Sequence, residues 1–385
     1  MQFVIVLGLS LCALGLFENF LHQRNLRRIP IRILVNGTRG KSSVTRLIAG
    51  ALRQAGFKTI AKTTGSEASI ILDDGSETPV SRPFGPRITE QKALARLAVR
   101  RGAQALVVEC MAVRAESQMV LQRQLVRSTI GVITNVRVDH IEEIGRDLDE
   151  TAAALSLAIP RDGTLVTTDP RFAASARRVV LADPSRIPDE VLSLFPYPAF
   201  PENVALALHV ADELGIDRET ALEGMVGARP DIGVLRVLEV EFPAFRAFVA
   251  NGFAANDVVS TKIVRARLSG LVPAGLPLVL LYNNRADREY RIPEFARMAR
   301  DMPDLRMVAA VGDHPKKVAR MFSGCAPEIV GFEPGTTAEQ LLASIGARIG
   351  AAFLLFGVGN IQGMGKSLMG YCIERGKPRG GAGEE

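Results

Sequence analysis

Apolar residues along this chain fall into short runs and longer periodic segments that follow one another. The short runs, rich in β-branched residues, predict buried strands at 31–35, 105–108 and 129–135. The longer segments carry apolar residues at helical spacing, as at 44–55 and 89–101, and each of these two is followed by a glycine. Strands that alternate with helices indicate an α/β fold with a mainly parallel sheet.

The alternation pauses near residues 227–233 and then begins again. Further strands are predicted at 245–250, 277–282, 306–311 and 352–356. We therefore expect two domains, a larger one at 29–232 and a smaller Rossmann-like α/β domain at 233–385.

The N-terminal residues form a separate element. Residues 3–17 are uncharged and almost wholly apolar, and counted to Leu21 the stretch holds about 19 residues, close to the roughly 20 that a membrane-spanning helix needs. Positive charges at Arg24, Arg27 and Arg28 come after the run, an order that predicts an uncleaved anchor with a cytoplasmic body. We predict that residues 1–28 are a membrane-anchoring helix with a basic flank. A buried or amphipathic helix that packs on a partner is the alternative.

Charge and composition narrow the classes of function. The net charge of +6 and the pI near 9.3 are mildly basic, and part of the excess lies in the arginines after the apolar run. With no Trp and four Tyr, a stacking platform for single-stranded nucleic acid is not indicated, and we predict no nucleic-acid partner. The four scattered cysteines form neither a disulfide framework nor a CxxC metal site, which suits a reducing cytosolic compartment.

A glycine-bearing loop follows the first predicted strand of the larger domain and precedes its first helix. It reads G37-T-R-G-K-S-S43, so one lysine and two hydroxyls stand at the helix start. Such a loop holds phosphates with its N–H groups, while Lys41 neutralises their oxygens and Ser42 can hold Mg²⁺. The strict pattern has a glycine where Val35 stands, so this is a shortened variant. A tight turn that merely needs glycine is the alternative.

Polar residues follow two neighbouring predicted strands. Glu109 comes directly after the strand at 105–108, and Asp139 and His140 come soon after the strand at 129–135. The carboxyl ends of parallel strands meet at one edge of a sheet, where a metal ligand beside a phosphate loop belongs. Each residue alone could be a satisfied polar group in a loop, but together they predict a metal-assisted nucleotide site.

A second glycine loop, residues 357–367, follows the last predicted strand. It ends in Gly365-Lys366-Ser367, and Asn360 stands where the strict phosphate-loop pattern has a glycine. Glycine-rich turns between strand and helix need no ligand, so nucleotide binding is not the preferred interpretation here.

These motifs together resemble the Mur ligase superfamily over residues 32–232. The loop at 37–43 resembles its G-T/S-x-G-K-T/S-T loop, V107-V-E109-C is similar to its strand ending in a magnesium-binding glutamate, and N135-V-R-V-D139-H140 is similar to its N-[IV]-x-x-D-H motif. The resemblance implies that the metal is held by Ser42, Glu109 and His140. It also implies that the nucleotide is held by Gly37, Thr38, Arg39, Gly40, Lys41, Ser42 and Ser43.

Two weaker matches extend the resemblance. E202-N203-V-A-L-A-L resembles a helix whose asparagine contacts adenine, although Asn203 could also cap the helix or lie exposed. G227-A-R229-P-D231 is a looser match to a G-R-x-E segment whose arginine reaches the ATP phosphates. The implied catalytic residues are therefore Lys41, Glu109, His140 and Arg229. One departure is that residues 147–158 contain no lysine, whereas many Mur ligases carry a carbamylated lysine there that supports a second metal.

A closer resemblance is to one branch of the superfamily, the ligase subunits of poly-γ-glutamate synthases (CapB or PgsB type). Members carry an N-terminal apolar segment directly before the ATP domain, and the runs at 108–113, 253–257 and 359–365 are similar to theirs. The resemblance implies a P-loop ATP domain, a Rossmann-like ligase domain and ATP-dependent γ-glutamyl amide ligation through an acyl phosphate, with Mg²⁺ or Mn²⁺. Strand-end residues of the second domain would complete the site when the domains close: Asn256, Asp257, Arg285 and Asp287.

The resemblance also implies partners. These are glutamate, the growing poly-γ-glutamate chain, the membrane, and small membrane and surface subunits of the CapC/PgsC and CapA/PgsA types; a homo-oligomer is left open. Two other functions compete with this one. A folylpolyglutamate-type or other Mur-like ligase acts on soluble metabolites and does not require an apolar anchor. A membrane-tethered P-loop ATPase that powers transport would hydrolyse ATP regardless of glutamate.

Overall fold

The computed structural model describes residues 2–65, 67–83, 85–137, 144–255 and 257–379. The chain divides into two compact units. Unit 1 comprises Met1–Pro188 and Phe200–Asp231, and unit 2 comprises Asp189–Ala199 and Ile232–Glu385. The short segment Asp189–Ala199, which contains α6 (Asp189–Ser193), thus belongs to unit 2 although unit 1 surrounds it in sequence.

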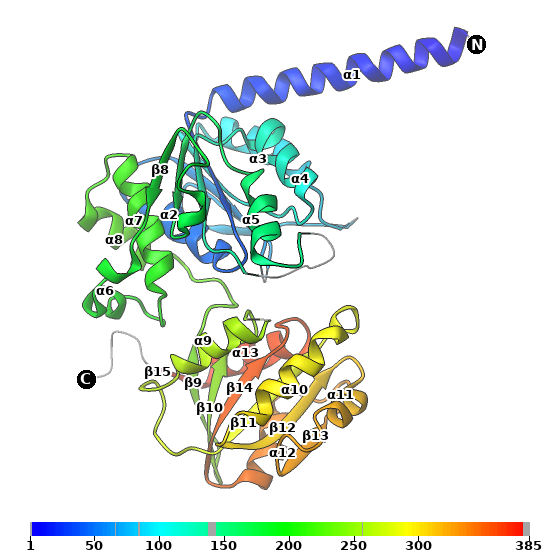
Figure 1. The fold of residues 1–385 in the computed structure, drawn as a ribbon, viewed down its shortest axis with the longest axis vertical. Coiled ribbons are helices and arrows are strands. Elements are labelled where there is room, and N and C mark those ends of the chain that lie inside the picture. The colour runs from blue at the N-terminus through cyan, green and yellow to red at the C-terminus, as the bar shows by residue number, and fades with distance from the viewer. Residues whose placement is uncertain (1, 66, 84, 138–143, 256, 380–385) are drawn as a thin grey trace. The chain divides into compact units, whose positions relative to one another are not determined.

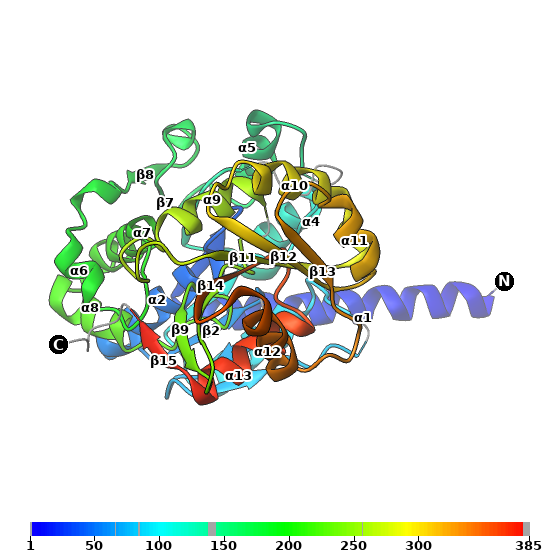
Figure 2. The ribbon, with the colours of Figure 1, turned by 90° about the horizontal axis from the view of Figure 1, so that it is seen from below.

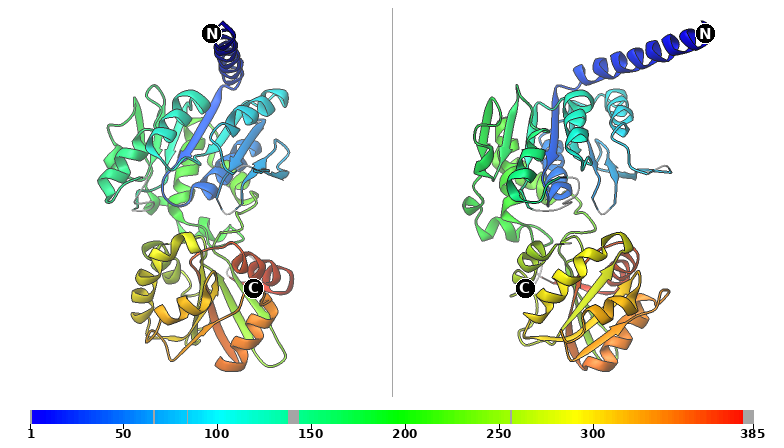
Figure 3. Two further views of the ribbon diagram at one scale, coloured as in Figure 1. Left: turned by 90° about the vertical axis from the view of Figure 1, so that its right-hand side faces the viewer. Right: turned by 45° about the vertical axis from the view of Figure 1, so that its right-hand side comes forward.

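Unit 1 is built on an eight-stranded sheet of order β4-β3-β2-β5-β1-β6-β7-β8. Strands β2, β5, β1, β6, β7 and β8 are parallel, and the hairpin β3–β4 adds an antiparallel edge. Figure 3 shows β1, drawn in blue, among the inner strands of this sheet. The strands are β1 (Ile31–Asn36), β2 (Thr59–Thr63), β3 (Ser69–Ile71), β4 (Glu77–Pro79), β5 (Ala105–Glu109), β6 (Ile130–Ile133), β7 (Thr164–Thr167) and β8 (Arg178–Leu181).

Helices cover both faces of this sheet. On one face, the helix α2 packs against β2 and β5 and against the helices α7 and α8. On the other face, apolar side chains of α3 and of the π-helix η1 share a core with Leu34, Leu106 and Val108 of the strands. Strands buried on both faces explain the nearly continuous apolar runs in the sequence. The helices of this unit after the first are α2 (Lys41–Gln54), α3 (Glu90–Arg100), α4 (Ala115–Val120), η1 (Leu121–Val126), α5 (Leu148–Ser156), η2 (Pro170–Phe172), η3 (Pro184–Arg186), α7 (Pro201–Glu213) and α8 (Arg218–Val226).

The N-terminal helix α1 (Gln2–Arg27) extends away from the rest of unit 1 (Figures 1 and 2). Its apolar side chains up to Leu21 are exposed. An 18-residue window of the helix has a mean hydropathy of 2.1, and none of that window is buried. Only its C-terminal part packs on the body, where His22 and Leu26 are buried and the His22 Nε2 lies 3.0 Å from the Leu125 O of η1. By length and composition α1 could cross a membrane.

Unit 2 contains a seven-stranded sheet of order β13-β12-β11-β14-β10-β9-β15. The first five strands in this order are parallel, and β9 and β15 form an antiparallel edge. The strands are β9 (Val237–Glu241), β10 (Arg246–Asn251), β11 (Leu278–Asn284), β12 (Leu305–Gly312), β13 (Glu328–Gly331), β14 (Ala352–Val358) and β15 (Lys377–Arg379). The helices after α6 are α9 (Val258–Ala266), η4 (Ala286–Arg291), α10 (Ile292–Arg300), α11 (Pro315–Met321), α12 (Ala338–Ile349) and α13 (Met364–Arg375).

Two cores hold unit 2 together. On one face α12 and α13 pack their apolar side chains onto Val249, Leu281 and Leu355. Elsewhere the ring of Tyr282 lies 5.1 Å from that of Phe295 and 5.2 Å from that of Phe322, centroid to centroid. Aromatic packing of this kind fixes helices α10 and the end of α11 against β11.

The predicted α/β fold class with an N-terminal apolar helix is confirmed. The pattern missed the strand β9 and the C-terminal strand β15, so the second sheet is mixed rather than wholly parallel. Residues 169–198 contain the edge strand β8 and short helical turns.

Candidate active site

The predicted phosphate loop lies between β1 and α2, and both of its glycines have positive φ. Gly37 has φ 122°, and a Cβ there would lie 2.2 Å from the Thr134 Oγ1. Gly40 has φ 83°, and a Cβ there would lie 2.6 Å from the Asn203 Oδ1. Each position therefore requires glycine for two reasons, its backbone conformation and the closeness of a neighbouring side chain.

The residues that follow β6 fix the backbone of this loop. The Thr38 N–H donates to the Asn135 O at 3.0 Å, and the Arg39 N–H donates to the Asn135 Oδ1 at 3.1 Å. The Thr134 hydroxyl donates to the Arg39 O at 2.6 Å. A loop tied to a neighbouring strand end in this way is held in one shape before any ligand arrives.

The first turn of α2 carries the groups that suit an anion. The helix begins at Lys41, and no side chain of the described residues caps it. The N–H groups in the first turn of a helix point away from the helix and suit the binding of an anion. The Lys41 Nζ donates to the Gly37 O at 2.7 Å and to the Thr38 O at 3.2 Å, which holds the ammonium beside the loop. Positive charge and the N–H groups of a helix start thus meet at one place.

Glu109, the last residue of β5, lies against this helix start. Its side chain is only 2% exposed, and its Oε2 accepts from the Ser42 hydroxyl at 2.9 Å and from the Thr64 N–H at 2.6 Å. Burial raises the pKa of Glu109, while the charge of Lys41 and the hydrogen bonds from Thr64 and Ser42 lower it. The strand register, in which Glu109 pairs with Val35, brings Glu109 and Ser42 together as the sequence predicted.

Asp231 is a second buried acid at this place, and sequence reasoning did not assign it a role. It is 5% exposed, and its charge raises the pKa of Glu109. A Cβ on Gly65 would lie 2.2 Å from the Ser42 Oγ and 3.9 Å from the Asp231 Oδ2, so both oxygens border the same spot. The signal that could have found it is the acid that ends the segment G227-A-R-P-D231.

The donor set fits a hard divalent cation. Ser42, Glu109 and Asp231 all offer oxygen atoms, the ligands that Mg²⁺ and Mn²⁺ prefer. Within the described ranges no group of three or more His, Cys, Asp or Glu side chains could hold a metal, and the predicted ligand His140 lies outside the described residues, as does Asp139. Mg²⁺ is usually held by one or two carboxylates with water and substrate phosphates completing its shell.

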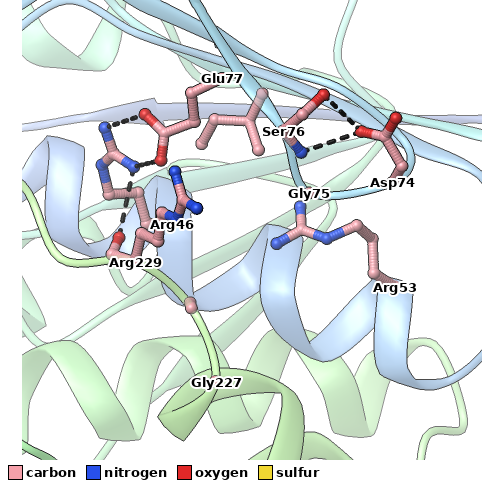
Figure 4. Close-up of a pocket in the computed structure, with 10 residues that line it drawn as sticks. Arg46, Arg53, Asp74, Gly75, Ser76, Glu77, Gly227 and Arg229 are labelled. Carbon is pink, nitrogen blue, oxygen red and sulfur yellow. Dashed lines mark hydrogen bonds and ion pairs between the residues drawn. The ribbon is translucent and has the colours of Figure 1, made fainter.

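The remaining predicted residues of unit 1 are placed as follows. Asn203, on the first turn of α7, lies against Gly40 of the loop. Arg229 lies beside α2, where its backbone O accepts from the Arg46 Nη1 at 3.2 Å, and it lines a pocket with Arg46 and Arg53 (Figure 4). Contacts of Asn203 with adenine and of Arg229 with phosphates stay predictions.

The predicted residues of unit 2 form local interactions. Asp257 caps α9, where its Oδ1 accepts from the Ser260 N–H at 2.8 Å and its Oδ2 from the Ser260 hydroxyl at 2.7 Å. Arg285 and Asp287 form an exposed two-bond ion pair with distances of 2.9 and 2.8 Å. Asn256 lies outside the described residues.

A buried lysine borders the same sheet edge. Lys62 of β2 is 1% exposed, and its Nζ lies 2.5 Å from the Glu90 Oε2. Burial alone would raise the pKa of Glu90, but hydrogen bonds from Arg82, Lys62 and the Arg87 N–H lower it to about 2. Glu90 therefore links Arg82, in the loop after β4, to Lys62 of β2.

Comparison with known proteins assigns the family. The model described as "Mur ligase middle domain" matches residues 35–175, and the one described as "Poly-gamma-glutamate synthase CapB C-terminal domain" matches residues 237–375. The chain is 38% identical over 383 residues to "PGA synthase CapB" of Bacillus subtilis (strain 168), covering 96% of this chain and 97% of that one. The chain belongs to the CapB family of poly-γ-glutamate synthases. As a CapB homologue it is an ATP-dependent amide ligase of the Mur ligase type.

Two further similarities agree with this assignment. The CapB relative from Bacillus anthracis, "Capsule biosynthesis protein CapB", is 37% identical over 392 residues, with 97% of this chain and 83% of that one covered. A folylpolyglutamate synthase/dihydrofolate synthase from Yersinia pestis, solved with AMPPNP and a Mn ion, shares the fold with a TM-score of 0.67 at 13% identity, covering 96% of this chain and 97% of that one. The chain thus has a Mur-ligase-like fold. The Mur ligase family uses ATP and a divalent metal.

Proposed function

We propose that this chain joins glutamate residues through γ-amide bonds and so extends poly-γ-glutamate at a membrane. The observation that carries the proposal is the buried Glu109–Ser42 pair beside Lys41, in a chain similar to CapB proteins over nearly its whole length. Loop, lysine, hydroxyl and acid together are suited to phosphoryl transfer from ATP.

The proposed reaction has two steps. A γ-carboxylate oxygen of glutamate attacks the γ-phosphorus of ATP, ADP leaves, and an acyl phosphate forms. The amine of a second glutamate then attacks the acyl carbon, the bond from that carbon to the bridging oxygen breaks, and phosphate leaves with that oxygen. The amine loses a proton as the amide forms.

The chief physical demand of the first step is to bring two anions together. Lys41 and the N–H groups at the start of α2 offset the charge of the phosphates, and the fixed loop means that little reorganisation is needed at the moment of reaction. Arg229 is predicted to reach the phosphates as well, but it lies beside Arg46 and Arg53, in a pocket on the flank of α2. No protein nucleophile is required, because the substrate carboxylate supplies the attacking atom.

We propose Mg²⁺, with Mn²⁺ as a substitute, as the metal of this site. Ser42 and Glu109 would hold it, with Asp231 close by, and His140 is the proposed ligand of a second ion. The ion would supply positive charge at the oxygens of the transferred phosphoryl group. In unit 2 we propose that Asn256, Asp257, Arg285 and Asp287 act on the nucleotide or the substrate when the domains close.

The membrane is the proposed location. The exposed apolar surface of α1 and the arginines that follow it support a single N-terminal anchor with the catalytic body in the cytoplasm. We propose that the chain works with small membrane and surface subunits of the CapC/PgsC and CapA/PgsA types. An anchored synthase would suit a polymer that must leave the cell.

Release of ADP that depends on glutamate tests this proposal. Membranes containing the full chain and its partner subunits are supplied with ATP and either L- or D-glutamate, and ADP and polymer are both measured. We expect ADP release to rise with one or both glutamates and to accompany polymer formation. ADP release that is indifferent to both would contradict the proposal and favour a transport ATPase. Lys41→Ala does not separate these two functions, because both need the phosphate loop.

A further inference from the structure

A pocket of about 430 Å³ lies on the flank of α2, away from its first turn. The turn of the β3–β4 hairpin (Asp74, Gly75 and Ser76) and the segment Gly227–Arg229 after α8 border it (Figure 4). Three arginines line it: Arg46 and Arg53 of α2, and Arg229. Arg53 stands twelve residues after Lys41, which places it about 18 Å further along the helix at 1.5 Å per residue.

One of these arginines, Arg46, already has a carboxylate partner in the protein, although its Nε is buried without a hydrogen-bond partner among the described residues. The Arg46 Nη1 lies 2.5 Å from the Glu77 Oε1, and its Nη2 lies 2.9 Å from the Glu77 Oε2, a two-bond pair in which both side chains are largely buried. Glu77 therefore neutralises Arg46. It has no second pair of oxygens for another guanidinium.

Arg53 is in a different state. Its Nη1 is buried and has no hydrogen-bond partner among the residues that the structure describes, although the guanidinium points toward the turn at Gly75 (Figure 4). The nearest acid in that turn, Asp74, is engaged elsewhere: its Oδ1 accepts from the Ser76 N–H at 2.9 Å and from the Ser76 hydroxyl at 2.6 Å, and its Oδ2 lies 3.8 Å from the Arg101 Nη2. Burial lowers the pKa of Arg53, and the charge of Arg46 lowers it further, while the charges of Glu77 and Asp74 only partly oppose the shift.

We propose that this pocket is a second anion site, which binds a small polyanion carrying at least two carboxylate or phosphate groups. Arg53 and Arg229 present guanidinium groups to it, and guanidinium binds both kinds of group in the same two-bond geometry. Such a ligand gives the Arg53 Nη1 a hydrogen-bond acceptor, which the described residues do not supply. The inference does not depend on the ligase reaction, because the site is separate from the phosphate loop.

Two kinds of ligand carry such anionic groups, a γ-linked glutamate oligomer or a phosphate compound. Binding is measured by calorimetry on the full chain in detergent, with a non-hydrolysable ATP analogue and Mg²⁺ present so that the phosphate loop is occupied. The probes are tri-γ-glutamate and inorganic pyrophosphate. Arg53→Gln is compared with Arg100→Gln. Each arginine lies in the last turn of its helix, α2 or α3, but Arg100 is exposed whereas Arg53 is half-buried, so the control makes the same chemical change outside the pocket.

We expect at least one probe to bind the native chain and the Arg100→Gln variant equally, and to bind Arg53→Gln about tenfold or more weakly. If only tri-γ-glutamate binds, the site recognises carboxylates. If only pyrophosphate binds, it recognises phosphates. If both bind, it accepts either anion. Arg53→Lys keeps the charge without the fork and should bind with intermediate affinity. Without ligand, Arg53→Gln should unfold at the same temperature as the native chain or higher, since it removes a poorly paired charge.

Two results would overturn the proposal. One is that neither probe binds while the phosphate loop is occupied. The other is that Arg53→Gln and Arg100→Gln bind the probes equally well, provided that thermal unfolding shows both to be folded; should Arg53→Gln not fold, equal binding by Arg53→Lys and the native chain is the overturning result.

Discussion

Two glycine loops in this chain carry the letters Gly-Lys-Ser after a buried parallel strand, one in each unit. In unit 1 the helix begins at the lysine itself, Lys41, whose ammonium lies beside the loop carbonyls. In unit 2 the helix α13 begins at Met364, so Lys366 is its third residue. Two residues turn a helix by about 200°, so the lysines stand differently with respect to the loops that precede them.

The neighbouring strands differ more than the loops do. The strand next to β1 ends in Glu109, a buried carboxylate that binds the hydroxyl after the lysine. The strands on either side of β14 end in amides, Asn251 of β10 and Asn284 of β11. The Asn283 side chain donates to the Asn360 O at 2.5 Å and the Gln362 O at 2.7 Å, which holds the second loop in place. A buried carboxylate at the end of the adjacent strand thus sets the first loop apart from the second, and a metal-assisted phosphate site needs such a group.

Replacement of the two lysines should give the largest contrast. Lys41→Ala removes the charge beside the loop, and we expect kcat to fall about a hundredfold to a thousandfold. Lys366→Ala should keep the rate of glutamate-dependent ADP release within about threefold of the native chain. Comparable losses from both would mean that the second loop also acts on ATP.

Glu109→Gln should lower kcat about a hundredfold while leaving the fold intact. Burial raises the pKa of Glu109 in the folded chain above its ordinary value of 4.5. The folded state then binds the proton more tightly than the unfolded state does. The free energy of unfolding therefore falls as the pH rises from 4.5 through the pKa of the folded state. At pH 7 the variant should therefore be as stable as the native chain or more stable. Thermal unfolding with and without Mg²⁺ checks this: added metal should stabilise the native chain only, and equal stabilisation of both would place the metal elsewhere.

The sequence predicted the centre of this site because the relevant information is local. The strand, glycine loop and helix at 31–55 adjoin in the chain, and Glu109 follows from the rule that parallel strand ends share an edge. Asp231 comes from a segment more than a hundred residues later, and no periodicity tells which strand end such a segment reaches. The pattern assigned no element to the strand β9, although L238-E-V-E alternates apolar and polar residues as a partly buried strand does.

The pocket beside α2 could not be predicted for a related reason. It depends on how Asp74 and Glu77 share their oxygens among Ser76, Arg46 and Arg101, and sequence gives the charges but not the pairing. The helix α1, by contrast, could be predicted, because its length, its apolar character and its basic end all follow from residues adjacent in the chain.

Alanine at one glycine of each loop should separate strain from crowding. Gly40 and Gly363 both have positive φ, at 83° and 63°, but of these two only Gly40 has a described neighbour that a Cβ would meet, the Asn203 Oδ1. We expect Gly363→Ala to cost about 1–2 kcal/mol of stability through strain alone, and Gly40→Ala to cost more and to reduce activity as well. Chemical denaturation and ADP release measure the two effects. Equal costs would show that Asn203 does not crowd the phosphate loop.

Asn283→Ala should have the smallest effect. It leaves two carbonyls without a side-chain donor, and because Gln362 is exposed, water can replace part of what is lost. We expect a loss of about 1–2 kcal/mol in the free energy of unfolding and an unchanged KM for ATP. A KM that rises in step with the lost stability would instead tie the second loop to the nucleotide.

The fate of one oxygen atom tests the central claim most directly. Glutamate labelled with heavy oxygen in its γ-carboxylate is supplied with ATP to membranes containing the full chain, and the released phosphate is analysed by mass. Ligation through an acyl phosphate predicts that each phosphate carries one labelled oxygen, because that oxygen bridges carbon and phosphorus before the amide forms. Phosphate whose new oxygen comes only from water would contradict the account, since the chain would then be hydrolysing ATP without activating a carboxylate.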